Sequence, residues 1–252
     1  MAEWIYGRQS VREALRSERR VRKVLISTEG QGPEISQILD LAGRRGLSCE
    51  RASLAMIGRV AQGNHQWVAA LLDDIAPETF LNFLSGLPPG PGTFVCLLDD
   101  VQDPQNLGAV IRAAVCFGCA GVVIPKHHSA PLGAAVMKAS SGALAHARVA
   151  EIANLGVALR DLHEAGFWVM GADAGAGSEP ISKTEFRSPL AIVLGNEHRG
   201  IKPILKKLCD RLVSIPAMKD VASLNVSQAA SVFFYEARLR GAGGRGSGPE
   251  EI

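Results

Sequence analysis

Leu190-Ala191-Ile192-Val193-Leu194-Gly195-Asn196-Glu197 is the stretch that most clearly defines the fold of this 252-residue chain. Five apolar residues follow one another without interruption and then stop at a glycine, an amide and a carboxylate. A continuous apolar strand is typical of a parallel sheet that is buried on both faces. Open α/β sheets bind their ligands at the carboxyl ends of such strands. The stretch therefore predicts a buried strand that carries polar residues into a binding crevice.

Two other segments rich in small residues follow the same pattern. Asn106-Leu107-Gly108-Ala109-Val110-Ile111-Arg112 comes after the apolar run 94–98, and Ser223-Leu224-Asn225-Val226-Ser227 comes after the run 211–215. Each segment lies where a β-like run gives way to a loop or a helix, and each carries Asn, Arg or Ser. The three segments together indicate one composite site at the edge of the sheet.

From residue 93 onward, apolar runs of strand length alternate with segments of helical periodicity, which predicts a parallel sheet with helices on both faces. The expected strands are 94–98, 121–124, 149–152, 167–171, 190–194 and 211–215. The expected helices are 106–117, 132–144, 155–164 and 226–240. The last helix is apolar on most sides, so we expect it to pack against the sheet and against a second subunit.

The first 75 residues predict a smaller α/β unit, with strands 21–28, 47–52 and 67–72 and helices 10–19, 34–45 and 54–61. Ser10 to Glu13 matches a capping box, which places the start of the first helix at Ser10. Residues 76–92 are rich in proline and glycine, which predicts a semi-rigid linker without regular structure. The chain therefore divides into an N-terminal domain 1–75, a linker 76–92, a domain 93–240 and a flexible tail 241–252.

The composition is that of a globular protein with a sizeable core, since 47% of the residues are hydrophobic and 21% are charged. No apolar run reaches the roughly 18 to 20 residues that span a bilayer. The N-terminus has no basic-then-apolar signal pattern. Five cysteines, an odd number, argue against a disulfide framework and for a reducing compartment. We therefore expect a cytoplasmic protein with no membrane partner.

Cys116-Phe117-Gly118-Cys119 has the C-x-x-C spacing of zinc and redox sites. No second such pair exists, so we expect two small buried residues there instead, and no metal site. The glycine patterns of phosphate loops and dinucleotide sites are absent. Asp99-Asp100 fits either a magnesium or ribose contact or an ordinary turn, and the glycine-rich residues 171–177 predict a flexible loop.

Basic residues are concentrated near the N-terminus, with seven between Arg8 and Lys23 against two acids. Such clustering is the electrostatic footprint of a polyanion partner such as RNA. A solvated helix face is the alternative, because basic runs are common on helices. The candidate RNA-binding residues are Arg8, Arg12, Arg16, Arg19, Arg20 and Lys23.

The three small-residue segments resemble, in their order and spacing, the motifs of the SpoU (TrmH-type) RNA ribose 2'-O-methyltransferases. The first motif corresponds to residues 103–112, the second to 192–197 with Gly200, and the third to 215–227. The resemblance covers roughly residues 93–240. Residues 5–66 resemble the ribosomal-protein-like substrate-binding domain of the subgroup that methylates a guanosine in 23S rRNA.

The resemblance implies a SPOUT-type C-terminal domain with a deep trefoil knot, a homodimer, and S-adenosylmethionine as the methyl donor. It implies in-line transfer of the sulfonium methyl group to a ribose 2'-hydroxyl of RNA, a reaction that needs alignment more than activation. The cofactor-binding residues that it implies are Gly171, Leu194, Gly195, Asn196, Gly200, Ile215 and Leu224. The catalytic residues that it implies are Arg112, Asn106, Glu197, Ser223 and Asn225.

The mechanism proposed for the family makes Arg112 the general base. Removing a proton from a guanidinium at pH 7 costs about 8 kcal/mol. A charged Arg112 that binds the adjacent phosphate and stabilises alkoxide character is physically easier. Gly108 lies one turn before Arg112, and its missing side chain would let a ligand approach the guanidinium closely. From this helix alone, a surface arginine on an amphipathic helix is the favoured interpretation.

Two departures from the family pattern concern recognition of the nucleotide. His198-Arg199 follows Glu197, and Trp67 follows His65-Gln66, at places where glycine is usual. Trp67 fits either stacking on an unpaired base or core packing. Two alternatives to a 23S rRNA enzyme are a tRNA ribose methyltransferase and a non-catalytic RNA-binding or ribosome-assembly factor. The polar residues of all three motifs argue against the second alternative.

Overall fold

Two wholly apolar strands, β6 (Phe94–Leu98) and β11 (Leu190–Leu194), pair in parallel inside an eight-stranded sheet, and every residue of both is buried. The computed structural model describes residues 2–61, 63–73, 75–88, 90–175, 177–196, 199–217 and 224–241. Within these ranges no helix has both the length and the apolar character needed to cross a membrane. Burial on both faces explains why both strands lack polar residues.

The larger sheet is parallel in every pairing that joins its strands, so the predicted parallel α/β sheet is confirmed. Its other strands are β5 (Glu78–Thr79), β7 (Val122–Pro125), β8 (Val149–Ile152), β9 (Trp168–Ala172), β10 (Glu179–Pro180) and β12 (Arg211–Ser214). The strand order is β10-β12-β9-β11-β6-β7-β8-β5. Neighbouring strands are therefore often far apart in the sequence, as with β6 and β11.

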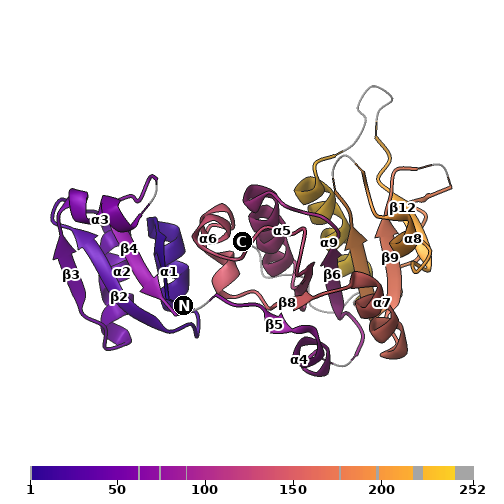
Figure 1. Ribbon diagram of the computed structural model, residues 1–252, viewed down its shortest axis with the longest axis horizontal. Coiled ribbons are helices and arrows are strands. Elements are labelled where there is room, and N and C mark those ends of the chain that lie inside the picture. The colour runs from indigo at the N-terminus through magenta and orange to yellow at the C-terminus, as the bar shows by residue number, and fades with distance from the viewer. Residues whose placement is uncertain are drawn as a thin grey trace.

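Helices cover both faces of this sheet (Figure 1). One apolar cluster joins one face to α5 (Pro104–Cys116), α6 (Ala134–Ala139) and α9 (Val226–Gly241). A second cluster joins the opposite face to α4 (Phe80–Ser85), α7 (Leu155–Glu164) and α8 (Pro203–Lys206). The sheet is therefore the middle of three layers, as the alternating sequence pattern predicts.

The N-terminal unit is a four-stranded mixed sheet with the order β1-β4-β2-β3. Its elements are β1 (Glu3–Tyr6), β2 (Val21–Ser27), β3 (Cys49–Ala52), β4 (Val68–Leu72), α1 (Arg8–Arg16), α2 (Pro33–Arg44) and α3 (Leu54–Val60). The strand β1, which pairs antiparallel with β4, was not predicted from the sequence. Its sequence, Glu-Trp-Ile-Tyr, neither alternates between apolar and polar residues nor forms a wholly apolar run, so no strand pattern stands out.

The predicted capping box at Ser10 is wrong. The helix α1 begins two residues earlier, after Gly7, whose φ of 91° is left-handed, and no side chain caps it. Ser10 lies inside the helix, is buried, and donates a hydrogen bond to the Met137 carbonyl at 3.5 Å. Ser10 therefore contacts the larger unit instead of starting the helix.

The expected linker 76–92 contains regular structure. Its residues form β5, which pairs with β8, and α4, whose N-cap Thr79 accepts a hydrogen bond from the backbone N–H of Asn82 at 3.4 Å. Phe83 of α4 is fully buried. Burial of this aromatic side chain stabilises the short helix despite the proline and glycine that follow it.

The expected helix 132–144 is divided into α6 and the 3₁₀ turn η1 (Ala143–Ala145). The break occurs at Ser141 and Gly142, which have φ angles of 52° and 90°. A Cβ atom on Gly142 would lie 2.7 Å from the Cβ atom of Glu13 in α1. The N-terminal unit therefore approaches the chain so closely here that only a glycine fits.

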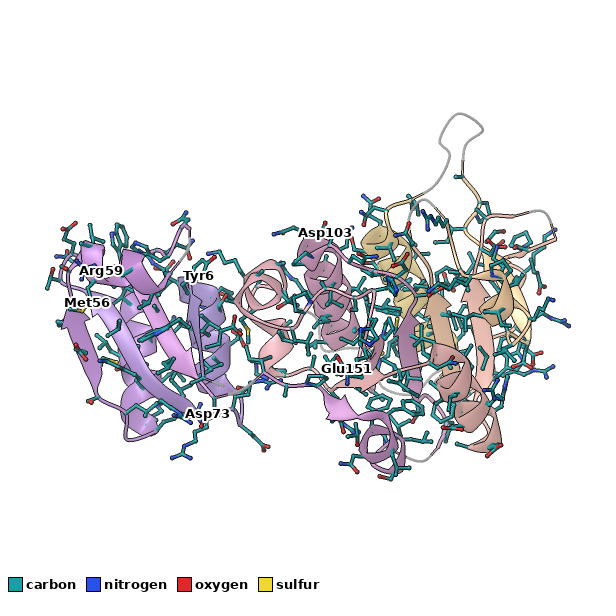
Figure 2. The ribbon with its side chains drawn as sticks, viewed as in Figure 1. Tyr6, Met56, Arg59, Asp73, Asp103 and Glu151 are labelled. Atoms are coloured by element: carbon teal, nitrogen blue, oxygen red, sulfur yellow. The ribbon has the colours of Figure 1, made fainter. Side chains whose placement is uncertain are left out.

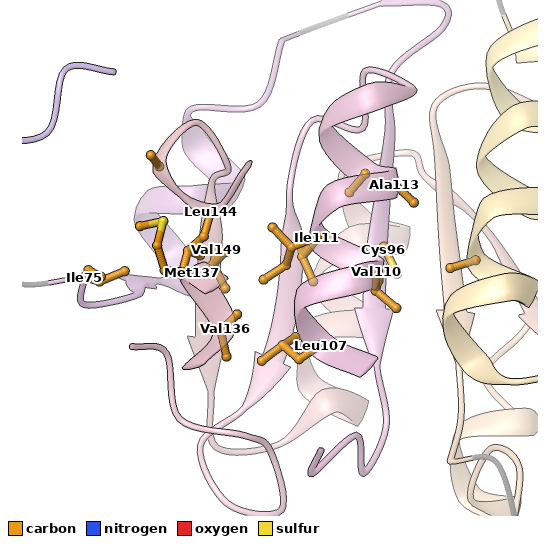
Figure 3. Close-up of a cluster of buried hydrophobic side chains, with 14 of the residues drawn as sticks. Ile75, Cys96, Leu107, Val110, Ile111, Ala113, Val136, Met137, Leu144 and Val149 are labelled. Atoms are coloured by element: carbon orange, nitrogen blue, oxygen red, sulfur yellow. The ribbon is translucent and has the colours of Figure 1, made fainter. Parts of the chain in front are cut away.

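The two units share one apolar core through α6, which lies between α1 and α5 (Figure 1). Figure 3 shows Leu107 and Ile111 of α5 facing Val136 and Met137 of α6. The same buried cluster includes Ile5 of β1. Each such side chain contributes about 1.5–3 kcal/mol when fully buried, so the contact between the units is a substantial part of the fold.

The C-x-x-C cysteines differ from the expectation that both are buried. Cys116 is exposed at the end of α5, whereas Cys119 is partly buried and donates a hydrogen bond to the Gly121 carbonyl at 3.2 Å. Burial raises the pKa of Cys119 to about 12, so its thiol stays protonated at neutral pH. Among the described residues, no group of three or more His, Cys, Asp or Glu side chains is placed to hold a metal ion.

Candidate active site

A cavity of about 780 Å³ lies at the carboxyl ends of β9, β11 and β12, against the first turns of α9. Small-molecule sites in proteins commonly measure about 300–1,000 Å³, so one nucleoside-sized ligand fits this space. Six residues that the sequence indicates for cofactor binding line it, namely Leu194, Gly195, Asn196, Gly200, Ile215 and Leu224. Of the three segments predicted to form one composite site, the second and the third therefore meet at this cavity, whereas no residue of the first lines it.

Gly171, the seventh of those residues, does not line the cavity. It is buried in β9, where a Cβ atom would lie 2.9 Å from Cys209 Sγ. The next residues, 172–175, form the wall instead, although the sequence indicates only a flexible loop there. Arg199 and Phe233 also line the cavity and were not predicted. For residues 172–175, the usable signal is their position directly after a buried strand.

Gly195 allows two backbone segments to cross at the cavity wall. A Cβ atom on Gly195 would lie 2.1 Å from the carbonyl carbon of Gly200. Gly200 has a φ of 65° and donates its N–H to the Asn196 carbonyl at 2.8 Å. The chain therefore folds back tightly after β11 and presents backbone groups to the cavity.

Two polar contacts hold this folded-back segment against the loop after β6. The Asn196 side chain donates to the Asp100 carbonyl at 3.0 Å. Asp99 is 1% exposed and accepts from both the backbone N–H and the ammonium of Lys202, at 2.9 and 2.8 Å. Asp99 therefore stabilises the loop after β6. This role fits the interpretation of the acidic pair as an ordinary turn better than a magnesium or ribose contact.

Asn225 joins the first and third motifs. Its side-chain N–H donates to Asn106 Oδ1 at 2.9 Å, across 119 residues of sequence. Its own Oδ1 accepts from the backbone N–H and the hydroxyl of Ser227, at 2.8 and 2.6 Å. Asn225 therefore also caps α9, as its position before the helix predicts.

Arg112 lies on the exposed side of α5, where its guanidinium donates to Ser141 Oγ at 3.0 Å. The interpretation of Gly108 as an opening for a ligand is wrong. Gly108 is buried, and a Cβ atom on it would lie 2.4 Å from the Cβ atom of Ala139 in α6. The glycine thus allows α5 and α6 to pack closely enough for Ser141 to reach Arg112.

None of the catalytic candidates that the structure describes lines the cavity. Asn106, Arg112 and Asn225 do not line the cavity, although the neighbours of Asn225 on both sides do. Glu197 and Ser223, together with His198, lie outside the described residues. The geometry therefore places the cofactor candidates in one space and links it to the helix of Arg112 through Asn106 and Asn225.

The basic residues of the N-terminal unit do not form one free face. Arg8 pairs with Glu34 at 3.1 Å, and Arg16 pairs with Glu13 at 3.2 Å. Arg12 lies 3.5 Å from Glu13, Lys23 lies 2.5 Å from Glu50, and Arg20 is 82% exposed at 3.7 Å from Asp73. Acidic partners thus neutralise much of the charge that the sequence clusters here.

Arg19, which is among the predicted RNA-binding residues, contacts the larger unit. Its guanidinium donates to the backbone carbonyls of Leu144 and Ala145 at 3.2 Å, across the contact between the two units. Burial there lowers the pKa of Arg19 below its usual value. Arg19 therefore stabilises the position of η1 against the N-terminal unit.

Comparison with known proteins identifies the family. Residues 93–235 match the SpoU rRNA Methylase family, and residues 4–77 match the family described as RNA 2'-O ribose methyltransferase substrate binding. The chain belongs to the SpoU methylase family. As such it is an S-adenosylmethionine-dependent RNA ribose 2'-O-methyltransferase, and the resemblance stated from its three motifs is confirmed.

Relatives of similar length share both units. YacO of Bacillus subtilis, named as a TrmH family tRNA/rRNA methyltransferase, is 32% identical over 242 residues, which are 93% of this chain and 94% of YacO. A TrmH family protein of Staphylococcus haemolyticus is 36% identical over 238 residues, covering 92% of this chain and 93% of its own. The match therefore extends across the SpoU methylases' N-terminal and C-terminal units alike.

Solved structures share the fold. The AdoMet-bound rRNA methyltransferase of Sinorhizobium meliloti has a TM-score of 0.77 at 23% identity and covers 94% of this chain and 87% of its own. AviRb of Streptomyces viridochromogenes, in complex with AdoMet, has a TM-score of 0.78 at 23% identity and covers 96% and 91%. Both support the two-unit SpoU architecture of this methylase.

Proposed function

We propose that this methyltransferase acts on the 2'-hydroxyl of a guanosine in 23S rRNA, in the cytoplasm and as a homodimer. The observation that supports a catalytic role is the cavity at the ends of β9, β11 and β12, joined to the helix of Arg112 by the Asn225–Asn106 hydrogen bond. The observation that favours rRNA is the separate N-terminal unit, whose family is described as substrate binding.

The cavity fits S-adenosylmethionine on its own chemistry. Leu194, Ile215 and Phe233 offer apolar side chains for a purine ring, and the glycines at 195 and 200 leave backbone groups accessible for hydrogen bonds. The bound cofactor supplies an electrophilic methyl group. The residues proposed to hold it are Leu194, Gly195, Asn196, Gly200, Ile215 and Leu224, whereas Gly171 acts by packing within the sheet.

Arg112 is the proposed catalytic cation. A guanidinium that keeps its charge binds the phosphate next to the target ribose and stabilises the alkoxide that develops at the 2'-oxygen. The Ser141 hydroxyl holds one of its nitrogen atoms, which reduces the number of orientations that the side chain samples. Asn106 and Asn225, with Glu197 and Ser223, are proposed to orient the ribose and Arg112.

Two further features of the proposal concern the whole molecule. The helix α9 carries two large apolar or aromatic side chains that are half-exposed, Tyr235 and Leu239. Side chains of this kind are suited to a contact between subunits. The proposed division is an RNA-binding domain 1–75 and a catalytic domain 93–240, to whose sheet the intervening residues add the strand β5. The trefoil knot that the resemblance implies stays a prediction.

The test of the function is mass-spectrometric mapping of 2'-O-methyl groups in rRNA and tRNA from cells with and without the gene. One guanosine of 23S rRNA should lose its methyl group. Loss confined to tRNA would establish the tRNA alternative instead. Isothermal titration with S-adenosylmethionine separates an enzyme from a pure RNA-binding factor, which should give no binding heat.

The Arg112→Lys variant tests the role of the arginine. Lysine keeps the positive charge but lacks the planar fork that binds a phosphate in two places. We expect RNA affinity within a few-fold of the unmodified protein and loss of most turnover. Normal turnover by this variant would contradict the proposed role.

A further inference from the structure

Trp67 is held in an unusual backbone conformation. Its φ is 68°, and that of the preceding Gln66 is 51°, so two successive non-glycine residues occupy the left-handed region. Such conformations cost free energy and persist only where surrounding contacts fix them, often at functional sites. The core-packing interpretation of Trp67 is wrong, because the residue is 38% exposed and belongs to none of the apolar clusters of the described residues.

Hydrogen bonds fix the Trp67 backbone on both sides. Its N–H donates to His65 Nδ1 at 3.1 Å, and its carbonyl accepts from the N–H of Ser27 at 2.8 Å. The Gln66 side chain accepts from the backbone N–H of Arg8 at 3.0 Å. The exposed ring therefore sits on a rigid loop and loses little further freedom when a ligand binds.

The Arg8 guanidinium lies over the Trp67 ring, 4.7 Å from its centroid. The Glu34 carboxylate at 3.1 Å and the Gln66 carbonyl at 3.4 Å hold this guanidinium in place. The result is a fixed pair of planar groups on an exposed surface. Unpaired RNA bases are recognised by stacking on aromatic rings and on arginine planes.

A second arginine–tryptophan pair shows that the exposed arrangement is particular to Trp67. Arg187 lies 5.7 Å from the centroid of the Trp168 ring. Trp168, however, belongs to β9 and packs against the main apolar cluster, so its ring is part of the core. The Trp67 pair lacks that structural role.

The loop of Trp67 is connected to the helix that supports Arg112. Lys138 of α6 donates to the Asn64 carbonyl at 2.9 Å and lies over the Tyr6 ring. Ser141, just beyond the same helix, binds Arg112. In Figure 2, Tyr6 lies along the same upper edge of the molecule as Asp103, at the start of α5. The loop that precedes Trp67 and the contact that holds Arg112 are therefore joined through the short helix α6.

We propose that the Arg8–Trp67 pair is a stacking subsite for one unpaired base of the RNA substrate. The subsite rests on the proposed function, which names RNA as the ligand. Because Glu34 balances the charge of Arg8, the subsite recognises the face of a base and not a phosphate. Loss of the ring should therefore lower RNA affinity without changing its dependence on salt.

The direct test is the intrinsic fluorescence of the full chain, which has three tryptophans at positions 4, 67 and 168. An unstructured RNA 12-mer of mixed sequence should quench the emission, whereas a blunt RNA duplex of the same length should not. Trp67→Phe should remove the quenching, and the matched Trp168→Phe should retain it. Quenching that persists in Trp67→Phe would overturn the proposal.

A second variant separates the subsite from the fold and from the donor site. Trp67→Gly removes the ring and suits the left-handed backbone, so it should fold at least as stably as the unmodified protein. We expect its affinity for the single-stranded 12-mer to fall about 5- to 150-fold, with the same salt slope and unchanged S-adenosylmethionine binding by calorimetry. Unchanged 12-mer affinity in this variant would refute the subsite. Absence of donor binding in both proteins would instead count against the proposed function and leave the quenching result valid.

Discussion

Replacing Gly195 by alanine tests whether the backbone crossing at the end of β11 forms the wall of the donor site. The new methyl group would lie 2.1 Å from the carbonyl carbon of Gly200, 2.4 Å from its oxygen and 2.3 Å from the backbone nitrogen of Ile201. All three are main-chain atoms, so no side-chain rotation relieves the clash. The segment at Gly200 must retreat by about 0.9 Å to reach the 3.0 Å below which real Cβ contacts essentially never occur.

The size of the effect follows from that displacement. A shift of about 1 Å in a positioned group costs roughly 100-fold in function, which corresponds to about 2.7 kcal/mol. Overpacking of this kind also destabilises the fold by about 1–3 kcal/mol. For a chain of this size, each kcal/mol lowers the melting temperature by roughly 2–4 °C. We therefore expect turnover to fall by about two orders of magnitude and donor binding to weaken with it, together with a moderately lower melting temperature.

The assay is isothermal titration with S-adenosylmethionine, with the melting temperature measured on the same samples. Gly43→Ala in α2 is the matched control, because a Cβ atom there meets nothing within 4 Å. The control should keep its donor affinity and gain about 0.5–1 kcal/mol of stability, since alanine favours a helix over glycine. If Gly195→Ala folds and binds the donor within threefold of the unmodified protein, the crossing is not the wall of the donor site.

Three further predictions concern Arg112, the packing of α5 and the buried thiols. Ser141→Ala should lower turnover about tenfold, the equivalent of one hydrogen bond to a charged group, with unchanged S-adenosylmethionine affinity. Ser141→Asn should restore part of the turnover, because asparagine tolerates the left-handed backbone. Equal turnover in the two variants and the unmodified protein would exclude a positioning role for Ser141. Gly108→Ala should destabilise the fold by about 1–3 kcal/mol in urea unfolding, because its methyl group would meet Ala139 at 2.4 Å; a midpoint at or above that of the unmodified protein would contradict the close packing of α5 on α6. Burial raises the pKa of Cys209 to about 12 from an ordinary value near 9. The unfolded chain therefore loses this proton at a lower pH than the folded protein, and the free energy of unfolding should fall as pH rises above about 9. Cys209→Ala should make that fall shallower, whereas an unchanged dependence of stability on pH would show that this thiol does not contribute.

Strands with one chemical character could be predicted from the sequence almost to the residue. The bounds of β6 and β11 agree with the apolar runs 94–98 and 190–194, because burial on both faces excludes polar residues along their whole length. Short elements were missed for the opposite reason. The two-residue strand β5 exists because it pairs with β8, about 70 residues later in the chain, and no local pattern records that partner.

Polar residues of the candidate site could be predicted from the sequence. Residues that reach the site only because of the order of strands in the sheet could not. Asn106 and Asn225 stand out as polar residues beside apolar runs, and the structure joins them. Residues 172–175 are small and mostly apolar, and the one acid among them, Asp173, pairs with Lys206 at 2.8 Å, so their position after a buried strand is the only signal of a ligand. They reach the cavity because β9 lies between β11 and β12 in the sheet, and sheet order cannot be read from the order of strands along the chain.

The segment 134–146 links the N-terminal unit to Arg112. The N-terminal sheet holds it at one end through Glu3, whose carboxylate accepts from the backbone N–H of Ala134 at 2.9 Å, and at the other through Arg19, which donates to two carbonyls of η1. Between these points Ser141 binds Arg112. Packed interiors transmit displacement instead of absorbing it. A shift of the N-terminal unit would therefore move the support of Arg112 or break these bonds, so the proposed docking of RNA and the orientation of Arg112 are physically connected.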